Sequence, residues 1–132
     1  MKVLIAAILT AAALGGMIGR AGAEPPRSEL LQSCHNVLGA VGTSDEATVE
    51  IPVAGLACWY YMSAVQNMSA VVDQHGRPLL GICAPAGTTL LQYVRIFARY
   101  ASRHPDQDAD NPAPLVLHAL LDAFPCGTRR PA

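Results

Sequence analysis

The first 23 residues constrain the fold most, because they decide the redox environment in which the cysteines of this chain find partners. A short basic start, Met1-Lys2, precedes an apolar run from Val3 to Ala13, and small residues then end in Ala21-Gly22-Ala23. This arrangement is typical of a secretory signal peptide with an A-x-A cleavage site. A membrane anchor would need about 20 apolar residues, and Arg20 interrupts the run. We expect residues 1–23 to be cleaved after export through the Sec pathway, which makes the mature protein periplasmic.

Four cysteines remain in the exported chain, and an even number in an oxidising compartment favours disulfides over metal thiolates. None lies in a C-x-x-C pair, so zinc-ribbon, thioredoxin-like and c-type haem sites all lack their signatures. Four cysteines allow three pairings, and their spacing does not choose among them. Each bridge is worth roughly 3–4 kcal/mol in the chain-entropy model, which is a large share of the stability of a small domain. The four are Cys34, Cys58, Cys83 and Cys126.

The expected mature chain, residues 24–132, is short enough to form a single domain. Cleavage removes Lys2 and Arg20, which leaves seven arginines and no lysine against ten acidic residues. The net charge is therefore about −3, whereas a general nucleic-acid binder carries a basic patch. We expect neither a nucleic acid nor, after signal cleavage, a membrane as a partner.

Apolar residues at three- and four-residue spacing predict an all-α fold, a small four-helix domain within about residues 28–126. The first helix starts at the N-cap Ser28 and runs to about Leu38. The second has the clearest apolar face of the four and runs from Pro52 to about Gln74, with Asp73 on its polar side, until Gly76 and Pro78 end it. We expect that face to lie inward, with these residues: Val53, Leu56, Ala57, Tyr60, Tyr61, Ala64, Val65, Met68, Val71 and Val72.

The third helix is predicted to begin at a capping box of Thr89 and Gln92 and to stop at His104-Pro105. Asn111 caps the fourth helix, and a proline follows at the first helical position. The fourth helix is apolar nearly all round as far as Phe124. Such a helix belongs in the middle of a bundle.

Three acids between the third and fourth helices, Asp106, Asp108 and Asp110, reproduce the D-x-D-x-D start of a calcium-binding loop. The calcium pattern then requires Gly at its sixth position and Glu at its twelfth. Asn111 and Leu117 stand at those positions. We therefore expect a solvated acidic turn, and no metal or other cofactor.

Two further polar groups have a structural and a functional interpretation. His118 and Asp122 lie four residues apart, so their side chains can meet, but no activated nucleophile accompanies them. Arg95, Arg99 and Arg103 line one ridge of the third helix and could hold an acidic partner. We favour a polar pair at a helix edge for the first group and a solvated helix face for the second.

Trp59 falls on the polar face of the second helix, beside Ser63 and Gln66. An indole in that position lies beneath another segment or belongs to an interface, where tryptophan is enriched. We expect it to lie beneath the loop of residues 39–52, and we retain it as a candidate partner-binding residue.

Short motifs follow one another in a defined order over nearly the whole stretch from Leu30 to Cys126. They are Cys58-Trp59-Tyr60-Tyr61, Cys83-Ala84-Pro85, Gly87-Thr88-Thr89-Leu90, His104-Pro105, Pro112-Ala113, Leu115-Val116, Ala119-Leu120 and Ala123-Phe124-Pro125-Cys126. Their order and spacing resemble the Tai-type family of periplasmic immunity proteins, which protect bacteria from peptidoglycan amidases delivered by type VI secretion. One departure is Tyr60, which stands where the family usually has glycine.

The resemblance implies a compact helical fold, homodimerisation, and inhibition by occlusion of the active site of an amidase. It implies no cofactor and no catalytic group, so we expect the protein not to be an enzyme. For the disulfides it implies Cys34 with Cys58, and Cys83 with Cys126.

The leading hypothesis is a periplasmic immunity-type protein that binds a peptidoglycan amidase effector. We expect the acidic loop of residues 104–111, with His104, Asp106, Asp108 and Asp110, to face a cationic cleft in the enzyme. Two alternatives remain. One is a periplasmic chaperone of the acid-stress kind, and the other is an enzyme, for which a credible nucleophile, base and metal set is missing.

Overall fold

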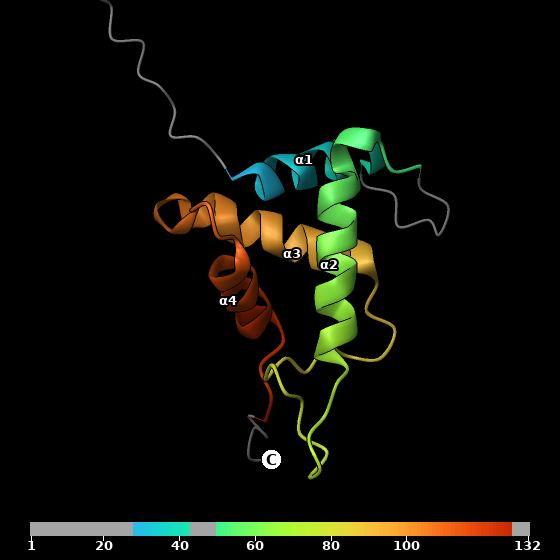
Figure 1. Cartoon of the computed structure of the whole chain (residues 1–132), viewed down its shortest axis with the longest axis vertical. Coiled ribbons are helices and arrows are strands. Elements are labelled where there is room, and N and C mark those ends of the chain that lie inside the picture. The colour runs from blue at the N-terminus through green and yellow to red at the C-terminus, as the bar shows by residue number, and fades with distance from the viewer. Residues whose placement is uncertain (1–27, 43–49, 128–132) are drawn as a thin grey trace, which may run out of the picture.

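Four α-helices and two short 3-10 turns make up the computed structural model, which describes residues 28–42 and 50–127 (Figure 1). The elements in chain order are α1 (Glu29–Val41), η1 (Val53–Gly55), α2 (Leu56–Ser69), α3 (Leu90–Arg103), η2 (Pro105–Gln107) and α4 (Ala113–Ala123). The predicted all-α, four-helix class is confirmed. The expected signal peptide, residues 43–49 of the predicted loop and the tail from residue 128 lie outside the described residues. Among the described helices, none is long and apolar enough to cross a membrane.

The central element is α3, which packs against α1, α2 and α4. It crosses the middle of Figure 1, with α1 above it, α4 below it and α2 in front of its N-terminal half. Its buried face consists of Leu91, Tyr93, Val94, Phe97, Ala98 and Ala101. This arrangement makes α3 the helix on which the other three are assembled.

The prediction that the fourth helix occupies the middle of the bundle is wrong. One side of α4 buries Leu115, Val116, Ala119 and Leu120, whereas His118, Leu121 and Asp122 on the other side are exposed. The apolar composition of α4 makes burial of most of its surface possible. The surface that is in fact buried depends on how many helices pack against α4. Here α4 packs chiefly on α3, so its outer side has no cover among the described residues.

The predicted starts of α1 and α3 are confirmed in atomic detail. The Oγ of Ser28 accepts a hydrogen bond from the Leu31 N–H at 3.3 Å. At α3, the Gln92 N–H donates to Thr89 Oγ1 at 3.2 Å, and the Thr89 N–H donates to Gln92 Oε1 at 2.8 Å. These side chains satisfy N–H groups that have no partner within the helix.

The other helix boundaries differ by a few residues from the prediction. α1 continues to Val41 and ends at Gly42, whose φ of 58° is in the left-handed region that glycine tolerates. The N-cap of α4 is Pro112, one residue later than predicted. Asn111 still serves this end, because its Oδ1 accepts a hydrogen bond from the Ala113 N–H at 3.2 Å.

The second helix departs most from the prediction, both in length and in orientation. A 3-10 turn replaces its first residues, and α2 ends at Ser69, so Val71 and Val72 lie outside it. Only Cys58 and Met62 of α2 are fully buried. The face that was predicted to lie inward is largely the outward one: Val53, Ala57, Tyr60, Ala64, Met68, Val71 and Val72 are all exposed.

Two disulfides join the pairs that the family resemblance implies. Cys34 of α1 is bonded to Cys58 of α2, and both residues are completely buried. Cys83 is bonded to Cys126 just beyond α4, and both of these residues are exposed. The first bridge therefore lies inside the core, whereas the second lies at the surface and connects the segment before α3 to the end of α4.

The inner bridge is reinforced by a close approach between α1 and the residues that lead into α2. The buried Ser33 hydroxyl donates to the Ala54 carbonyl at 2.9 Å and accepts from the Cys58 N–H at 3.0 Å. Gly55 lies so close to α1 that an added Cβ would be 2.8 Å from Cγ2 of Val37. Hydrogen bonds, disulfide and steric contact together fix the start of α2 against α1.

We expect Gly55→Ala to destabilise the fold by about 1–3 kcal/mol, because Val37 is fully buried and must shift to admit the new methyl group. Gly39→Ala is the matched control. Gly39 lies in α1 with nothing within 4 Å of an added Cβ, so alanine there should stabilise by about 0.5–1 kcal/mol. Urea unfolding of the oxidised proteins measures both values, and equal effects at the two sites would contradict the close approach.

Candidate partner-binding surface

Most of the exposed large hydrophobic residues of the described chain lie on the outward side of α2 or close to its two ends. We call this surface the α2 outer face and define it as Val53, Ala57, Tyr60, Ala64, Met68 and Val71. Ala57, Tyr60, Ala64 and Met68 recur at three- and four-residue steps and form one stripe along α2, while Val53 and Val71 are exposed before and after the helix. Val53 is 86% exposed, Tyr60 68% and Met68 55%. Monomeric soluble proteins rarely leave such a continuous apolar stripe in water, so it is a candidate interface.

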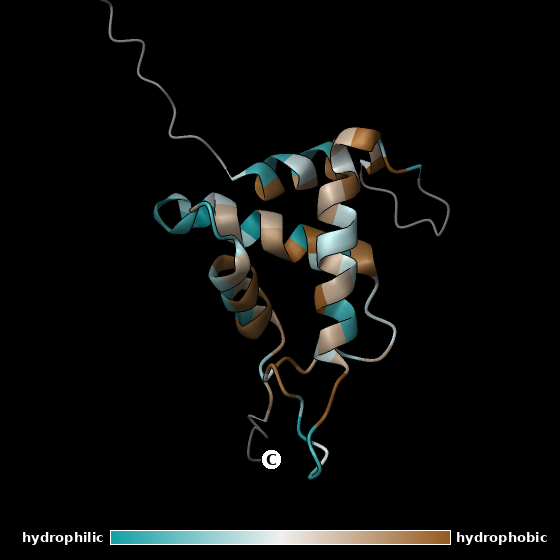
Figure 2. Ribbon diagram, in the orientation of Figure 1, coloured by the Kyte–Doolittle hydropathy of each residue, from teal (hydrophilic) through white to brown (hydrophobic). Residues whose placement is uncertain are grey.

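The helix that carries this face contains no charged residue. From Leu56 to Ser69 it reads LACWYYMSAVQNMS. Figure 2 shows α2 mostly in white to brown, with a teal band near its C-terminal end. Such a helix lacks the charged outer face that surface helices of globular proteins usually have. Since α1 and α3 cover only the side with Cys58 and Met62, the opposite side lacks a cover among the described residues.

A tight hairpin follows α2 and extends below the helices (Figure 1). Its arms are joined by backbone hydrogen bonds from Leu79 N to Val71 O at 3.0 Å and from Asp73 N to Arg77 O at 2.8 Å. Gly76, with a φ of 75°, makes the reversal possible. Val71, Val72 and Leu79 are exposed, which continues the apolar α2 outer face onto the hairpin.

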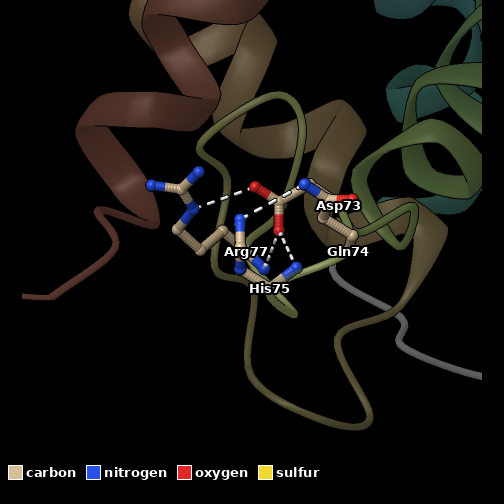
Figure 3. A network of polar contacts seen from close by, with 4 residues as sticks. All are labelled: Asp73, Gln74, His75 and Arg77. Carbon is tan, nitrogen blue, oxygen red and sulfur yellow. Dashed lines mark hydrogen bonds and ion pairs between the residues drawn. The ribbon is translucent and has the colours of Figure 1, made fainter.

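The Asp73 carboxylate organises the hairpin from inside (Figure 3). Oδ1 accepts the N–H groups of His75 at 2.7 Å and Arg77 at 3.0 Å, while Oδ2 accepts Arg77 Nε at 2.9 Å. The backbone hydrogen bond from Arg77 is the largest of the effects that lower the pKa of Asp73 below its ordinary value. The charged form of Asp73, which holds the turn together, therefore persists into mild acid.

The predicted acidic loop contains one inward and two outward carboxylates. Asp106 and Asp110 are exposed, as a partner-binding role requires. Oδ2 of Asp108 instead accepts the Ser28 N–H at 2.8 Å, at the start of α1. A carboxylate at a helix N-terminus is stabilised by the unpaired N–H groups and the dipole there. Asp108 thus connects this loop to α1.

The other two predicted partner-binding residues also have contacts within the fold. The His104 ring is stacked on Tyr100 with centroids 4.0 Å apart, and its Nδ1 is 2.9 Å from the Tyr100 carbonyl oxygen. Trp59 is half-buried and packs against the core. Residues 43–49, which belong to the loop predicted to cover Trp59, lie outside the described residues.

The polar groups on α3 and α4 line two open grooves. Arg95 and Arg99 border a groove of about 410 Å³ whose apolar wall includes Ile96 and Phe124. Arg95 Nη2 also donates to the Gly42 carbonyl at 3.3 Å. His118 and Asp122 border a second groove, of about 730 Å³. Both residues are exposed, and the described residues contain no group of three or more His, Cys, Asp or Glu that could hold a metal ion.

Sequence reasoning missed the α2 outer face and the hairpin as candidate surfaces. The sequence signal for the first was the complete absence of charge over 14 residues, which one buried face does not require. The signal for the second was Asp73 followed by Gly76, a combination that favours a turn. The helical pattern instead predicted that Asp73 lies on the polar side of a longer second helix.

Comparison of this sequence with known protein families supports a role in binding a partner protein. The family model of the Rap1a immunity proteins matches residues 27–126, which include all four described helices. No curated protein and no solved structure is similar enough to this chain to count as a match.

The matched stretch contains both disulfides, the capping box and the α2 outer face. The resemblance noted in the sequence is thereby confirmed at the level of an immunity protein, a class that acts against a bacterial toxin effector by binding it. This chain of four helices and two disulfides belongs to the Rap1a immunity proteins.

Proposed function

We propose that this immunity protein acts in the periplasm and neutralises a peptidoglycan amidase by covering its active site. The observation that carries the proposal is the ordered set of Tai-type motifs, from Cys58-Trp59 to Pro125-Cys126, inside the stretch that the family model matches. Amidase effectors act on the cell wall, so a protecting protein must meet them in the periplasm. The signal-peptide pattern of residues 1–23 supports this location, and a mature protein from cells that starts at Glu24 would agree with it.

The acidic loop between α3 and α4 is the proposed site for the effector. Asp106 and Asp110 present two exposed carboxylates, the first within the short turn η2 and the second after it. Asp108 holds the loop to α1 through the Ser28 N–H, which pre-organises the loop before binding. Paired charges across an interface raise the association rate and select among partners.

This loop and the α2 outer face lie at opposite ends of α3. Figure 1 shows η2 beyond the C-terminal end of α3, whereas α2 lies across its N-terminal half. The 14 residues of α3 span about 21 Å at 1.5 Å per residue. One molecule can therefore contact two partners at once. We propose a homodimer as the active form, with the effector bound at the acidic loop.

The oxidised mature protein should inhibit a peptidoglycan amidase effector from an interbacterial secretion system of the same or a related species. We expect a stoichiometric complex and loss of hydrolysis of purified peptidoglycan, because a bound protein excludes the polymer from the cleft. Size-exclusion chromatography and release of new amino termini measure the two effects. Stoichiometric capture of an effector with a different enzymatic activity would disprove the amidase assignment and leave the immunity role intact. Binding of many unrelated proteins that increases at low pH would favour the chaperone instead.

Reversing the exposed charges of the acidic loop should weaken effector binding without unfolding the protein. We expect Asp106→Lys and Asp110→Lys together to raise the dissociation constant by about tenfold or more, mainly through a slower association at low salt. Asp106→Lys and Asp110→Lys are also made singly. Asp122→Lys, which reverses an exposed acid on α4, is the matched control for each single variant. Unchanged affinity in the double variant would exclude the loop as the binding site.

Asp108 should behave differently from its two neighbours. Asp108→Ala removes the acceptor of the Ser28 N–H, so we expect it to lower the free energy of unfolding by about 1 kcal/mol. Asp106→Ala should change it by less than about 0.5 kcal/mol, since an exposed side chain makes little contribution. Urea unfolding compares the two variants, and an equal loss in both would contradict the structural role of Asp108.

A further inference from the structure

The groove of about 410 Å³ on α3 is bounded by the segment before that helix and by the end of α4. We call it the arginine groove. Its volume is within the range of about 300–1,000 Å³ that small-ligand sites have. None of the residues that line it is acidic. The lining consists of Gln92, Arg95, Ile96, Arg99, Phe124 and residues 85–88.

Positive charge is concentrated on the helix that carries this groove. Of the described arginines, Arg77 lies in the hairpin, while Arg95, Arg99 and Arg103 are all in α3. α3 contains no acidic residue. Arg99 is exposed and lies one helical turn from both of its arginine neighbours. The local potential therefore attracts an anion to Arg99, although the whole chain carries a net charge of −1.

The walls of the arginine groove are fixed by contacts within the fold. Thr88 donates to the Pro85 carbonyl twice, from its N–H at 3.1 Å and from Oγ1 at 2.7 Å. The Phe124 ring lies 5.6 Å from the Tyr93 ring between centroids, and the Phe124 carbonyl accepts the Cys83 N–H at 2.9 Å. A groove that is already formed loses little entropy when a ligand binds.

The side chains of the groove define the chemistry of its ligand. Arg99 has only donors. Gln92 Oε1 accepts the Thr89 N–H in the capping box, so the group that Gln92 can offer a ligand is its amide NH2, also a donor. Ile96 and Phe124 are half-buried and supply an apolar wall. This combination fits a carboxylate that is attached to a small apolar group.

We propose that the arginine groove binds the stem peptide of peptidoglycan, with a carboxylate on Arg99 and an alanine methyl group against Ile96 and Phe124. The inference rests on the proposed function, from which it takes the periplasmic location. Stem peptides carry several carboxylates that alternate with small apolar side chains. One exposed guanidinium binds weakly, so the groove suits a ligand that the wall presents in many copies better than a single acidic protein segment.

Binding to the wall would hold the immunity protein beside the bonds that the effector attacks. Many weak sites on one polymer raise the local concentration of the bound protein without a tight individual contact. The acidic loop remains accessible in this state, because neither η2 nor Asp110 lines the arginine groove. A wall-bound molecule can therefore still meet its effector.

The first experiment measures how much of the oxidised mature protein sediments with purified insoluble peptidoglycan at low salt. We expect the wild type to bind, and Arg99→Gln to raise the apparent dissociation constant about tenfold, because a charged hydrogen-bond donor is lost. Arg103→Gln makes the same change on the same helix outside the groove. It should raise that constant by less than about threefold, since it removes only a more distant charge.

A second pair of variants leaves every arginine in place. Ala86→Asp adds a carboxylate to the exposed lining of the groove and should repel the ligand. Ala40→Asp adds the same charge at an exposed position of α1 and should bind like the wild type. Circular dichroism and thermal unfolding check that all four variants fold.

The second experiment uses a soluble probe, the tetrapeptide L-Ala-γ-D-Glu-meso-diaminopimelate-D-Ala, and follows backbone amide signals by NMR. We expect binding at about millimolar peptide, with shifts confined to Arg99, Ile96 and residues 85–88. The same peptide with its carboxylates amidated keeps the size and the methyl groups but loses the charge, and it should not bind. Equal binding of the two peptides would contradict the contact with Arg99.

Two further outcomes would overturn the proposal. One is sedimentation of Arg99→Gln and Ala86→Asp with the wall to the same extent as the wild type. The other is wall binding that Arg99→Gln leaves unchanged while effector binding falls, which would assign the groove to an acidic segment of the effector. Inhibition of the amidase is measured separately. A protein that inhibits but does not bind the wall would disprove this site and keep the proposed function, and a protein that binds the wall but inhibits no amidase would do the reverse.

Discussion

The contact between α1 and the start of α2 is the constraint on which the rest of this structure depends. The Cys34–Cys58 bridge, the two hydrogen bonds of Ser33 and the close packing of Gly55 on Val37 all act between a short stretch of α1 and the residues from η1 to the first turn of α2. They fix the rotation of α2 about its own axis. Once Cys58 points inward, Met62 follows it on the next turn, and Tyr60 and Ala64 must point outward.

That rotation separates the molecule into a core and two outer regions. α1, α2 and α4 pack against the sides of α3. The loops at the two ends of α3 are therefore at the surface. The acidic loop lies at its C-terminal end and is held to α1 by Asp108, while the α2 outer face crosses its N-terminal half. A protein of this size thereby offers one charged and one apolar surface, far enough apart to serve different partners.

Local signals in the sequence predicted the local features well. As predicted, Ser28 caps α1, and Thr89 and Gln92 together cap α3. These caps are predictable because capping depends on residues only three positions apart. The two disulfide pairs agree with the family resemblance, which carries long-range information that spacing lacks. Of the acidic loop, the exposure of Asp106 and Asp110 could be predicted from their charge. The inward contact of Asp108 could not, since its partner Ser28 is 80 residues away.

The sequence by itself determined that this chain forms four helices joined by two disulfides, because periodicity, caps and cysteine count are properties of short segments. Only the tertiary structure decided which helix is central and which side of α2 is outside. Periodicity reports that one side of a helix is apolar, but it does not report what covers that side. In a helix without charge, nearly every side is compatible with burial, so a single disulfide and one close glycine contact settle the orientation.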